Sequence, residues 1–476
     1  MSDETTIMIG LETHVQLNSN TKIFCGCPNP VVYTANLKNK ELEPNTLTCP
    51  TCLGLPGSKP RTNAKVVELA TKTSLAVGCK IADATYFSRK TYFYPDMSKN
   101  FQTTQFEVPL AEKGEVELNV DELKKKIRIR RIHMEEDPAK IIHEKDYTLV
   151  DYNRSGIPLI EIVTEPDMKT PKEARLYLQK LAMILEYLGV YDSTSEAALK
   201  TDANISINGG NRVEIKNITG TKEIERALSY EFIRQKNAVK RGVVIVQETR
   251  QWDPTTGITK ALRTKESEAD YGYIFEPDLN VIDVDKKLTE RLKKEIPELP
   301  DDKEKRFIKA YKLTQKMAES LVAEKDIADL FEIASKNVSV ANAATWCGIV
   351  LKKTLNYNNL TFVQSGLKQE WMIELILSYE KKEYSDVIAE KILRKMVDDK
   401  CDSKTVAKKY KFQKLGDVGD VDSIVKKLIG ANKKAVDDYK AGSEKSLNFL
   451  VGQVMRETKG GVDANTARKK ILEMLK

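Results

Sequence analysis

The sequence predicts an α+β protein: a mixed α/β domain with a zinc knuckle, then an all-helical domain, then a small helical tail domain. Three observations predict it. Strand and helix patterns alternate through the first 290 or so residues. A Pro-rich, charged segment, PELPDDKEKRF (297–307), ends this mixture, and the pattern after it is helical. The chain of 476 residues is too long for one hydrophobic core, so we expect domains at 1–292, 293–400 and 401–476.

The first part begins with a strand that has one apolar and one polar face. Residues 7–17, IMIGLETHVQL, alternate between the two kinds of side chain, and side chains in a strand point alternately to opposite faces. The apolar face holds Ile7, Ile9, Leu11 and Val15, and the polar face holds Glu12, His14 and Gln16.

Helices are expected at 65–78, KVVELATKTSLAVG, and at 171–189, PKEARLYLQKLAMILEYLG. Apolar residues recur there at helical spacing, and each segment ends at Gly, which favours the C-terminus of a helix. The second helix is expected to begin at Pro171 behind Thr170. DANISIN and NRVEIKNI predict two further short strands.

The later parts are expected to be helical. KQEWMIELILSYEKKEYSDVIAEKILRKMV (368–397) has helical spacing with no Gly or Pro. EKSLNFLVGQVMRETKGG (444–461) predicts an amphipathic helix that stops at the Gly pair. Its apolar stripe, at i, i+3, i+4, i+7 and i+8, is Leu447, Leu450, Val451, Val454 and Met455.

Composition places the chain among globular proteins. It is 41% apolar and 31% charged, which excludes a disordered chain. No run approaches the ~20 apolar residues that a bilayer-spanning helix needs. The N-terminus, MSDETTIMIGLETHV, lacks the basic start and the continuous apolar stretch of a signal peptide. We therefore expect a cytoplasmic protein without a membrane partner.

The net charge of +7 is confined to the tail. Residues 401–476 hold 17 Lys and Arg against 10 Asp and Glu, whereas the first 400 residues hold 60 of each sign. A Lys-rich surface is often only a solvated face. The alternative is a patch that binds phosphates of a nucleic-acid backbone. In that case deletion of the tail would weaken binding of the nucleic acid and flatten its salt dependence.

Four of the seven cysteines predict a structural zinc site. Cys25 and Cys27 lie in FCGCPNP, and Cys49 and Cys52 lie in TLTCPTCLGLPG. A cytosolic chain does not use such pairs as structural disulfides. The turn at CPTCLG lets backbone N–H groups point at the sulfurs, and the two pairs supply four thiolates for a tetrahedral ion. No ligand position is then left for water, so this zinc is expected to be structural.

Carboxylates gather in several separate segments. HMEED places Glu135, Glu136 and Asp137 side by side, and like charges at this spacing favour a bound cation. Glu161 lies inside the apolar strand IPLIEIV, where an unpaired carboxylate would cost several kcal/mol. With Glu12, His14 and Asp202, these groups are expected at strand ends, where sites on α/β sheets tend to lie. Oxygen ligands with a single His suit Mg²⁺ or Mn²⁺; the bland interpretation is that each acid is an ordinary salt-bridged residue.

Several common motifs are missing. There is no G-x-x-x-x-G-K-[ST] loop and no G-x-G-x-x-G after a strand, so any nucleotide is expected to bind by an atypical route. No Ser-rich Gly motif of an amidase is present. With only three histidines, His14, His133 and His143, catalysis by a Cys–His pair has little support.

The motifs taken together resemble those of one family. IGLETHVQL, SRKTYFYPDM (88–97), RIHMEEDPAK (131–140), LVDYNRSGIPLIEIVTEPD (149–167), TDANISI and VEIKNI are similar, in this order, to signatures of the B subunit of the aspartyl/glutamyl-tRNA(Asn/Gln) amidotransferases, the GatB family. NFLVGQVMRETKGG resembles the C-terminal tRNA-binding domain of that family. The resemblance covers essentially the whole chain.

The resemblance implies an activity and its cofactors. Such a protein uses ATP to phosphorylate the side-chain carboxylate of Asp on tRNA(Asn) or Glu on tRNA(Gln), and ammonia then displaces the phosphate. Ammonia would come from the A subunit, which is a glutamine-hydrolysing amidase, and the small C subunit would clamp the pair. The first 292 residues would form the cradle domain of the family, with magnesium (or manganese) in the active site and structural zinc.

Site residues are carried over by matching motifs. The implied catalytic residues are Glu12, His14, Glu135, Glu136, Glu161 and Asp202. Of these, His14, Glu136 and Glu161 are the expected magnesium ligands, with His14 in its neutral form. The implied phosphate or substrate contacts are Arg89, Lys90, Lys216 and Asn217.

The chain departs from the common sequence pattern of the family in two places. STSEAALKTDANIS lacks the Glu-Gly pair of many relatives, and KNITGTKEIERAL resembles archaeal members. The E subunit of the archaeal Glu-tRNA amidotransferase shares the cradle motifs but carries an inserted domain before its helices. No insertion of that size interrupts this chain near residues 270–300, so the B subunit is favoured. Two other classes of protein stay open. One is a non-catalytic zinc-containing RNA-binding protein, and the other is a two-metal phosphohydrolase or nuclease.

Overall fold

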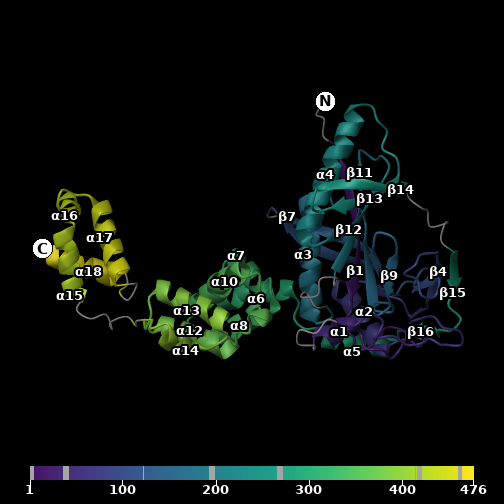
Figure 1. Cartoon of the computed structure of the whole chain (residues 1–476), viewed down its shortest axis with the longest axis horizontal. Helices are drawn as coiled ribbons and strands as arrows, with labels where there is room; N and C mark the ends of the chain where they lie inside the picture. The colour runs from purple at the N-terminus through teal and green to yellow at the C-terminus, as the bar shows by residue number, and fades with distance from the viewer. Residues whose placement is uncertain are drawn as a thin grey trace. The chain divides into compact units, whose positions relative to one another are not determined.

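The computed structural model describes residues 5–35, 42–121, 123–191, 199–264, 272–412, 414, 421–458, 462 and 464–475. The chain divides into two compact units, Met1–Leu299 and Pro300–Lys476 (Figure 1). Among the described helices, none combines the length and the apolar character that crossing a bilayer requires.

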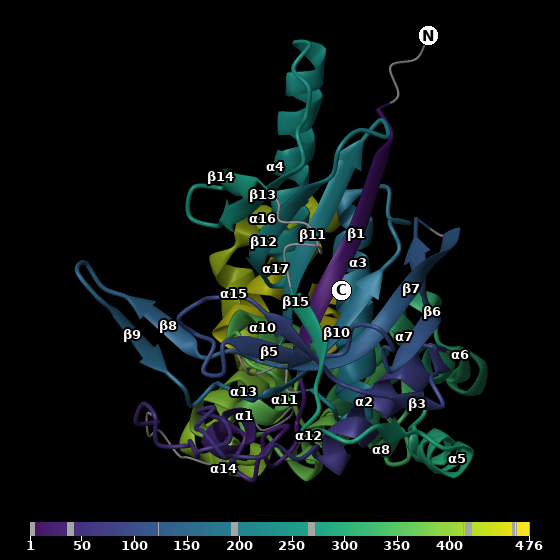
Figure 2. The ribbon, with the colours of Figure 1, turned by 90° about the vertical axis from the view of Figure 1, so that its right-hand side faces the viewer.

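A nine-stranded sheet forms the centre of the first unit. Its spatial order is β14 (Ile258–Thr264), β13 (Glu248–Asp253), β12 (Val213–Thr219), β11 (Leu199–Ile207), β1 (Ile7–Gln16), β10 (Pro158–Thr164), β7 (Leu123–Glu136), β6 (Ala111–Val120) and β2 (Lys80–Ile81). Strands β12 and β13 pair in parallel, and the other neighbours are antiparallel. The N-terminal strand β1 therefore lies in the middle of the sheet, between β11 and β10 (Figure 2).

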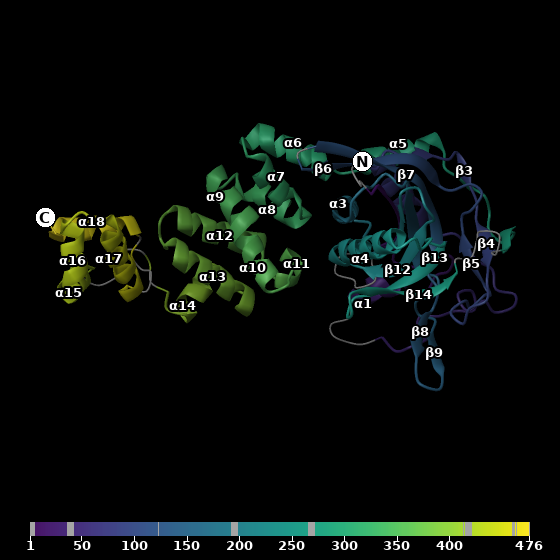
Figure 3. The same ribbon diagram turned by 90° about the horizontal axis from the view of Figure 1, so that it is seen from above.

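Helices cover the apolar face of this sheet. They are α2 (Ala64–Ala76), α3 (Pro171–Leu188) and α4 (Thr221–Lys240), and α3 and α4 lie along one side of the strands (Figure 3). Ile9, Leu11 and Val15 of β1 are fully buried in the core between the two layers. Burying such side chains contributes ~1.5–3 kcal/mol each, so the alternation along the sequence decides which face of β1 remains polar.

The predicted helix signals act as expected in α3. The Thr170 side chain accepts a hydrogen bond from the Glu173 N–H, Pro171 is the first helical residue, and Gly189 ends the helix in the left-handed conformation (φ 67°). Each feature satisfies or terminates backbone groups that the helix leaves unpaired. The helix places Tyr177 and Leu181 against the sheet.

Smaller elements complete the first unit. They are the short helices α1 (Pro30–Ala35) and α5 (Lys286–Glu295), a three-stranded sheet of β15 (Gly272–Phe275), β4 (Ser88–Thr91) and β5 (Phe101–Thr104), the pair β16 (Ile282–Asp283) and β3 (Ala84–Thr85), and the hairpin β8 (Lys140–His143) and β9 (Thr148–Asp151). Strand β5 packs on the end of β7. There the Thr103 N–H donates a hydrogen bond to the Glu136 carboxylate, and the Gln105 side chain accepts one from the Met134 N–H.

The second unit is helical, as the sequence predicts. Its first core is built by α6 (Pro300–Tyr311), α7 (Gln315–Val322), α8 (Lys325–Ala334), α9 (Val340–Thr345), a π-helix η2 (Trp346–Leu351), α10 (Lys352–Tyr357), α11 (Phe362–Ser365), α12 (Gln369–Glu380), α13 (Asp386–Asp399) and α14 (Ser403–Lys409). The expected helical stretch 368–397 forms two helices, because the chain turns through Lys382 at φ 57°. Val406 and Ala407 of α14, after residue 400, are buried in this same core.

Four short helices form a second core near the C-terminus. They are α15 (Val421–Ala431), α16 (Lys433–Lys440), α17 (Glu444–Glu457) and α18 (Ala464–Leu475). Helix α17 buries Leu447, Leu450, Val451 and Val454, and Met455 packs partly buried beside them, so the apolar stripe predicted for this helix is confirmed. The Gly pair after it lies outside the described residues.

Candidate functional site

The polar face of the sheet carries a regular grid of functional side chains. Paired residues on neighbouring strands face the same side. One row across β11, β1, β10 and β7 is Lys200, His14, Glu161 and His133. The next row is Asp202, Glu12, Val163 and Arg131, and the row on the other side is Gln16, Leu159 and Glu135. Strands far apart in the sequence therefore place an acidic group beside each of two imidazoles.

His14, Glu135 and Glu161 form the centre of this grid. His14 Nε2 lies 3.2 Å from Glu135 Oε1 and 3.6 Å from Glu161 Oε2. Each of the three residues offers one ligand atom, and these three atoms lie within 4.8 Å of one another. Such an arrangement could hold a metal ion. His14 lies two residues before the end of β1, Glu135 lies one residue before the end of β7, and Glu161 lies at the centre of β10. The cluster is therefore close to the ends of two of its three strands.

His133 is a fourth member of the cluster, and the motifs in the sequence did not assign it. Its Nε2 lies 3.1 Å from Glu161 Oε2 and 3.8 Å from Glu135 Oε2, and only 3% of its side chain is exposed. The signal was present in RIHMEED: His133 and Glu135 are two residues apart on a strand, so they share a face.

The four groups shift each other's pKa. Burial lowers the pKa of His14, but the hydrogen bond to Glu135 and the charges of Glu135, Glu161 and Asp202 outweigh it and raise the pKa to about 10. Burial also lowers the pKa of His133, but the neighbouring carboxylates outweigh it, so the pKa is raised. For Glu161, burial raises the pKa, but the charge of His133 and its neighbours lowers it to about 2. A cation bound here must therefore displace the proton from His14, because only neutral imidazole is a ligand.

The three adjacent carboxylates of HMEED have three different positive partners. Glu135 faces His14 and His133. Glu136 accepts hydrogen bonds from the Lys99 ammonium and the Thr103 N–H. Asp137 accepts two hydrogen bonds from the Arg154 guanidinium, at 2.7 and 2.6 Å.

This placement differs from the expected magnesium set of His14, Glu136 and Glu161. Glu136 was expected beside His14 and Glu161, but the structure places Glu135 there. Adjacent residues of a strand point to opposite faces, so only one of the two glutamates can face His14. The register of β7 against β10, with Glu161 opposite His133, selects Glu135.

Two further acids flank the cluster on the next row. Glu12 Oε1 accepts a hydrogen bond from Asn204 Nδ2 at 2.9 Å. Asp202 forms an ion pair with Lys216 at 3.1 Å, and Lys216 also lies 3.6 Å from Glu214. The structure thus brings Glu12, Asp202 and Lys216 to the same face as the cluster, and adds Asn204, which the sequence motifs did not single out.

The other expected phosphate contacts lie elsewhere or are not described. Arg89 and Lys90 lie on β4 of the three-stranded sheet, and Arg89 donates hydrogen bonds to Glu276 at 2.8 and 2.7 Å. The Glu276 carboxylate is buried, and it already takes hydrogen bonds from the Arg89 guanidinium that a phosphate would need. The side chain of Asn217 and the loop before Asp202, residues 192–198, lie outside the described part of the chain.

The four cysteines meet as the spacing predicts. Their four sulfur atoms all lie within 4.8 Å of one another; the residues are Cys25, Cys27, Cys49 and Cys52. The hydrogen bond from Cys25 and the Cys49 N–H lower the pKa of Cys52 to about 5, with help from the charge of Lys22. The Cys49 N–H lies 3.1 Å from the Cys52 sulfur. Four sulfurs with a stabilised thiolate among them fit a tetrahedral ion.

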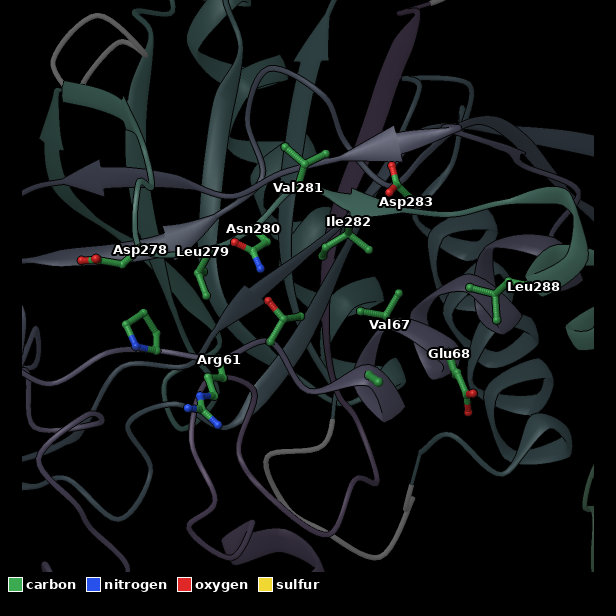
Figure 4. Close-up of a pocket in the computed structure, with 13 residues that line it drawn as sticks. Arg61, Val67, Glu68, Asp278, Leu279, Asn280, Val281, Ile282, Asp283 and Leu288 are labelled. Atoms are coloured by element: carbon green, nitrogen blue, oxygen red, sulfur yellow. The ribbon is translucent and has the colours of Figure 1, made fainter.

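Of two pockets in the first unit, one adjoins the grid of polar side chains and the other does not. One of about 170 Å³ adjoins it, since Glu12 and Asn204 line this pocket together with Arg130 and Arg212. A larger one of about 580 Å³ lies between α2 and the β16 region, and Leu279, Ile282 and Asp283 are among its lining residues (Figure 4). None of the residues that line the larger pocket belongs to the acidic cluster, so its size does not make it the candidate site.

Comparisons with known proteins identify the family of this chain. Residues 7–290 match the family model described as "GatB/GatE catalytic domain", and residues 329–475 match the "GatB domain". The similar relatives are named as the B subunit of aspartyl/glutamyl-tRNA(Asn/Gln) amidotransferase. The protein of Methanosarcina acetivorans is 45% identical, covering 99% of this chain and 98% of the relative. Those of Carboxydothermus hydrogenoformans and a Thermotoga species are 40% and 42% identical, with coverage of 99% and 98% of this chain and the same shares of the relatives. The chain therefore belongs to the family of B subunits of the aspartyl/glutamyl-tRNA(Asn/Gln) amidotransferases.

Proposed function

We propose that this chain phosphorylates the side-chain carboxylate of Asp-tRNA(Asn) or Glu-tRNA(Gln) with ATP and supports its conversion to the amide. The observation that carries the proposal is the cluster of His14, Glu135 and Glu161 on the polar face of the sheet. A carboxylate is a poor electrophile, and its attack on ATP brings anions together, so the site must compensate negative charge.

The chain's own residues have distinct parts in this chemistry. His14, Glu135 and Glu161 would hold the metal, and His133 orients Glu161 through their 3.1 Å contact. Magnesium or manganese bound there would neutralise the charge on the transferred phosphoryl group. Asn204 and Lys216 fix the orientations of Glu12 and Asp202, the flanking catalytic candidates.

Partners supply what this chain lacks. The sequence contains no amidase motif, so ammonia would come from glutamine hydrolysed by the A subunit, with the small C subunit completing a heterotrimer. The chain then forms part of a ligase that makes a carbon–nitrogen bond with glutamine as amide donor. The cysteine cluster would hold structural zinc, and the complex would act in the cytoplasm on aminoacylated tRNA.

We divide the chain into three domains. The boundary expected at 292/293 falls inside α5 (Lys286–Glu295), which belongs to the first unit, so we assign the cradle domain up to Leu299 and the helical domain from Pro300. Because α14 packs in the helical core, the tRNA-binding tail domain would begin at α15 and not at residue 401. Its own core of α15 to α18 supports this division.

Coupled ATP consumption tests the proposed function. With the purified amidase and the purified small partner protein present, ATP hydrolysis is expected to depend on Asp-tRNA(Asn) or Glu-tRNA(Gln) and to accompany formation of the amide. The measurement is ADP release with and without charged tRNA, followed by analysis of the released amino acid. Turnover that ignores charged tRNA would indicate a phosphohydrolase, and tRNA binding without turnover would indicate a non-catalytic RNA-binding protein.

Removal of the tail domain is expected to weaken tRNA binding. Residues 421–476 hold 12 Lys and Arg against 7 Asp and Glu, and each phosphate contact by such residues adds to the salt dependence of binding. A truncation before α15 leaves the helical core, including α14, complete. The measurement is the tRNA Kd between about 50 and 200 mM salt, and an unchanged salt slope would identify the lysines as a solvated face only.

A further inference from the structure

Lys200 ends the row of side chains that contains the metal cluster. It pairs with His14 across β11 and β1, and His14 pairs with Glu161 across β1 and β10. Cβ atoms of such opposed residues lie about 5 Å apart. The flexible four-carbon stem of lysine therefore allows the ammonium to reach an anion held over His14 and Glu161.

The side chain of Lys200 is half-buried, yet among the described residues it makes no ion pair within 4.0 Å. Three other cations near the acidic groups are occupied, whereas Arg131 in the next row likewise makes no ion pair among the described residues. Lys216 is paired with Asp202, Lys99 with Glu136, and Arg154 with Asp137. Asp137 and Asp202 act on this ammonium only from beyond ion-pair distance, alongside the like charge of Arg154. An ammonium withdrawn from water with no counter-ion in contact is unfavourable, and a bound anion would relieve that cost.

We propose that Lys200 binds the phosphate oxygens of the nucleotide whose phosphoryl group is transferred at this site. The inference rests on the proposed function and extends it to a residue that the motifs did not suggest. Lys216, the cation expected from the sequence to contact phosphate, is held by two carboxylates. Lys200 brings its charge without first breaking an ion pair, and a positive charge aimed at the transferring group stabilises the transition state.

Three variants of the complete heterotrimer test this proposal. In Lys200→Met the charge is lost while the apolar stem is kept, and in Lys200→Arg the charge is retained. Lys222→Met is the matched control, because Lys222 is an exposed lysine on α4. The measurements are kcat and KM for ATP, KM for charged tRNA, the equilibrium Kd of ADP and the melting temperature.

We expect kcat/KM for ATP to fall ~10²-fold in Lys200→Met, with weaker ADP binding and partial recovery in Lys200→Arg. KM for charged tRNA, the melting temperature and the Lys222→Met enzyme are expected to stay near wild type. A Lys200→Met enzyme within about twofold of wild type for ATP, or one changed only in KM for charged tRNA, overturns the inference while leaving the proposed function intact. Absence of tRNA-dependent ADP release in the wild-type heterotrimer overturns the proposed function instead.

Discussion

Replacement of His14 with alanine is expected to abolish amide formation while binding of charged tRNA survives. The imidazole contributes one of three ligand atoms, and it contacts both carboxylates that supply the other two. Without it, Glu135 and Glu161 remain close with less positive charge between them, and a loss of ~10²-fold or more in metal affinity or activity follows from removing a ligand or its support. The measurements are amide yield from charged tRNA, tRNA Kd and metal binding.

A matched histidine and a matched pair of glutamates make this prediction specific. His143 lies exposed at the end of β8, and its Nδ1 is 3.4 Å from the Thr148 hydroxyl, so His143→Ala is expected to keep full activity. Glu135→Gln should lose metal binding as His14→Ala does. Glu136→Gln should retain the metal and lower stability, because it weakens the contact with Lys99. Loss of tRNA binding in His14→Ala would contradict the assigned role.

The sequence predicted best those elements whose stabilising contacts lie close together along the chain. The strand predicted at 7–17 follows from the alternation of apolar and polar residues alone. The bounds of α3 follow from Thr170 and Pro171 at its N-terminus and from Gly189 at its C-terminus. The four sulfurs were predicted as a complete set, because the two short Cys-containing turns leave few other arrangements for them. The strand, the helix and each of the two Cys-containing turns depend on contacts within a few residues.

The metal cluster needed information that spacing does not contain. Glu161 is 147 positions from His14 in the chain, and only the pairing of β1 with β10 makes them neighbours. A shift of one residue in the register of β7 would place Glu136 and not Glu135 on this face. The sequence therefore indicated which segments carry the acids, but the choice between adjacent glutamates and the involvement of His133 required the register.

Removal of the zinc site is expected to destabilise the first unit. The ammonium of Lys22 is fully buried, and it donates hydrogen bonds to the Leu47 carbonyl at 2.8 Å and to the Cys52 sulfur at 3.7 Å. In Cys52→Ser the thiolate disappears, one of four metal ligands is lost, and the buried ammonium has no anionic partner. Breaking a buried ion pair in this way costs about 3–5 kcal/mol. Thermal unfolding and metal content measure the loss, and Cys401→Ser, which changes a cysteine outside the cluster, is the control.

A double-mutant cycle separates the two causes of this loss. If the orphaned ammonium contributes, Lys22→Met combined with Cys52→Ser should cost less than the sum of the single variants, because the pair interacts directly. If only the metal matters, the two costs should add, and a chelator should reproduce the Cys52→Ser effect in full. Wild-type protein that carries no zinc and keeps its melting temperature in chelator would contradict both accounts, since four converging thiols and a buried lysine would then be stable without an ion.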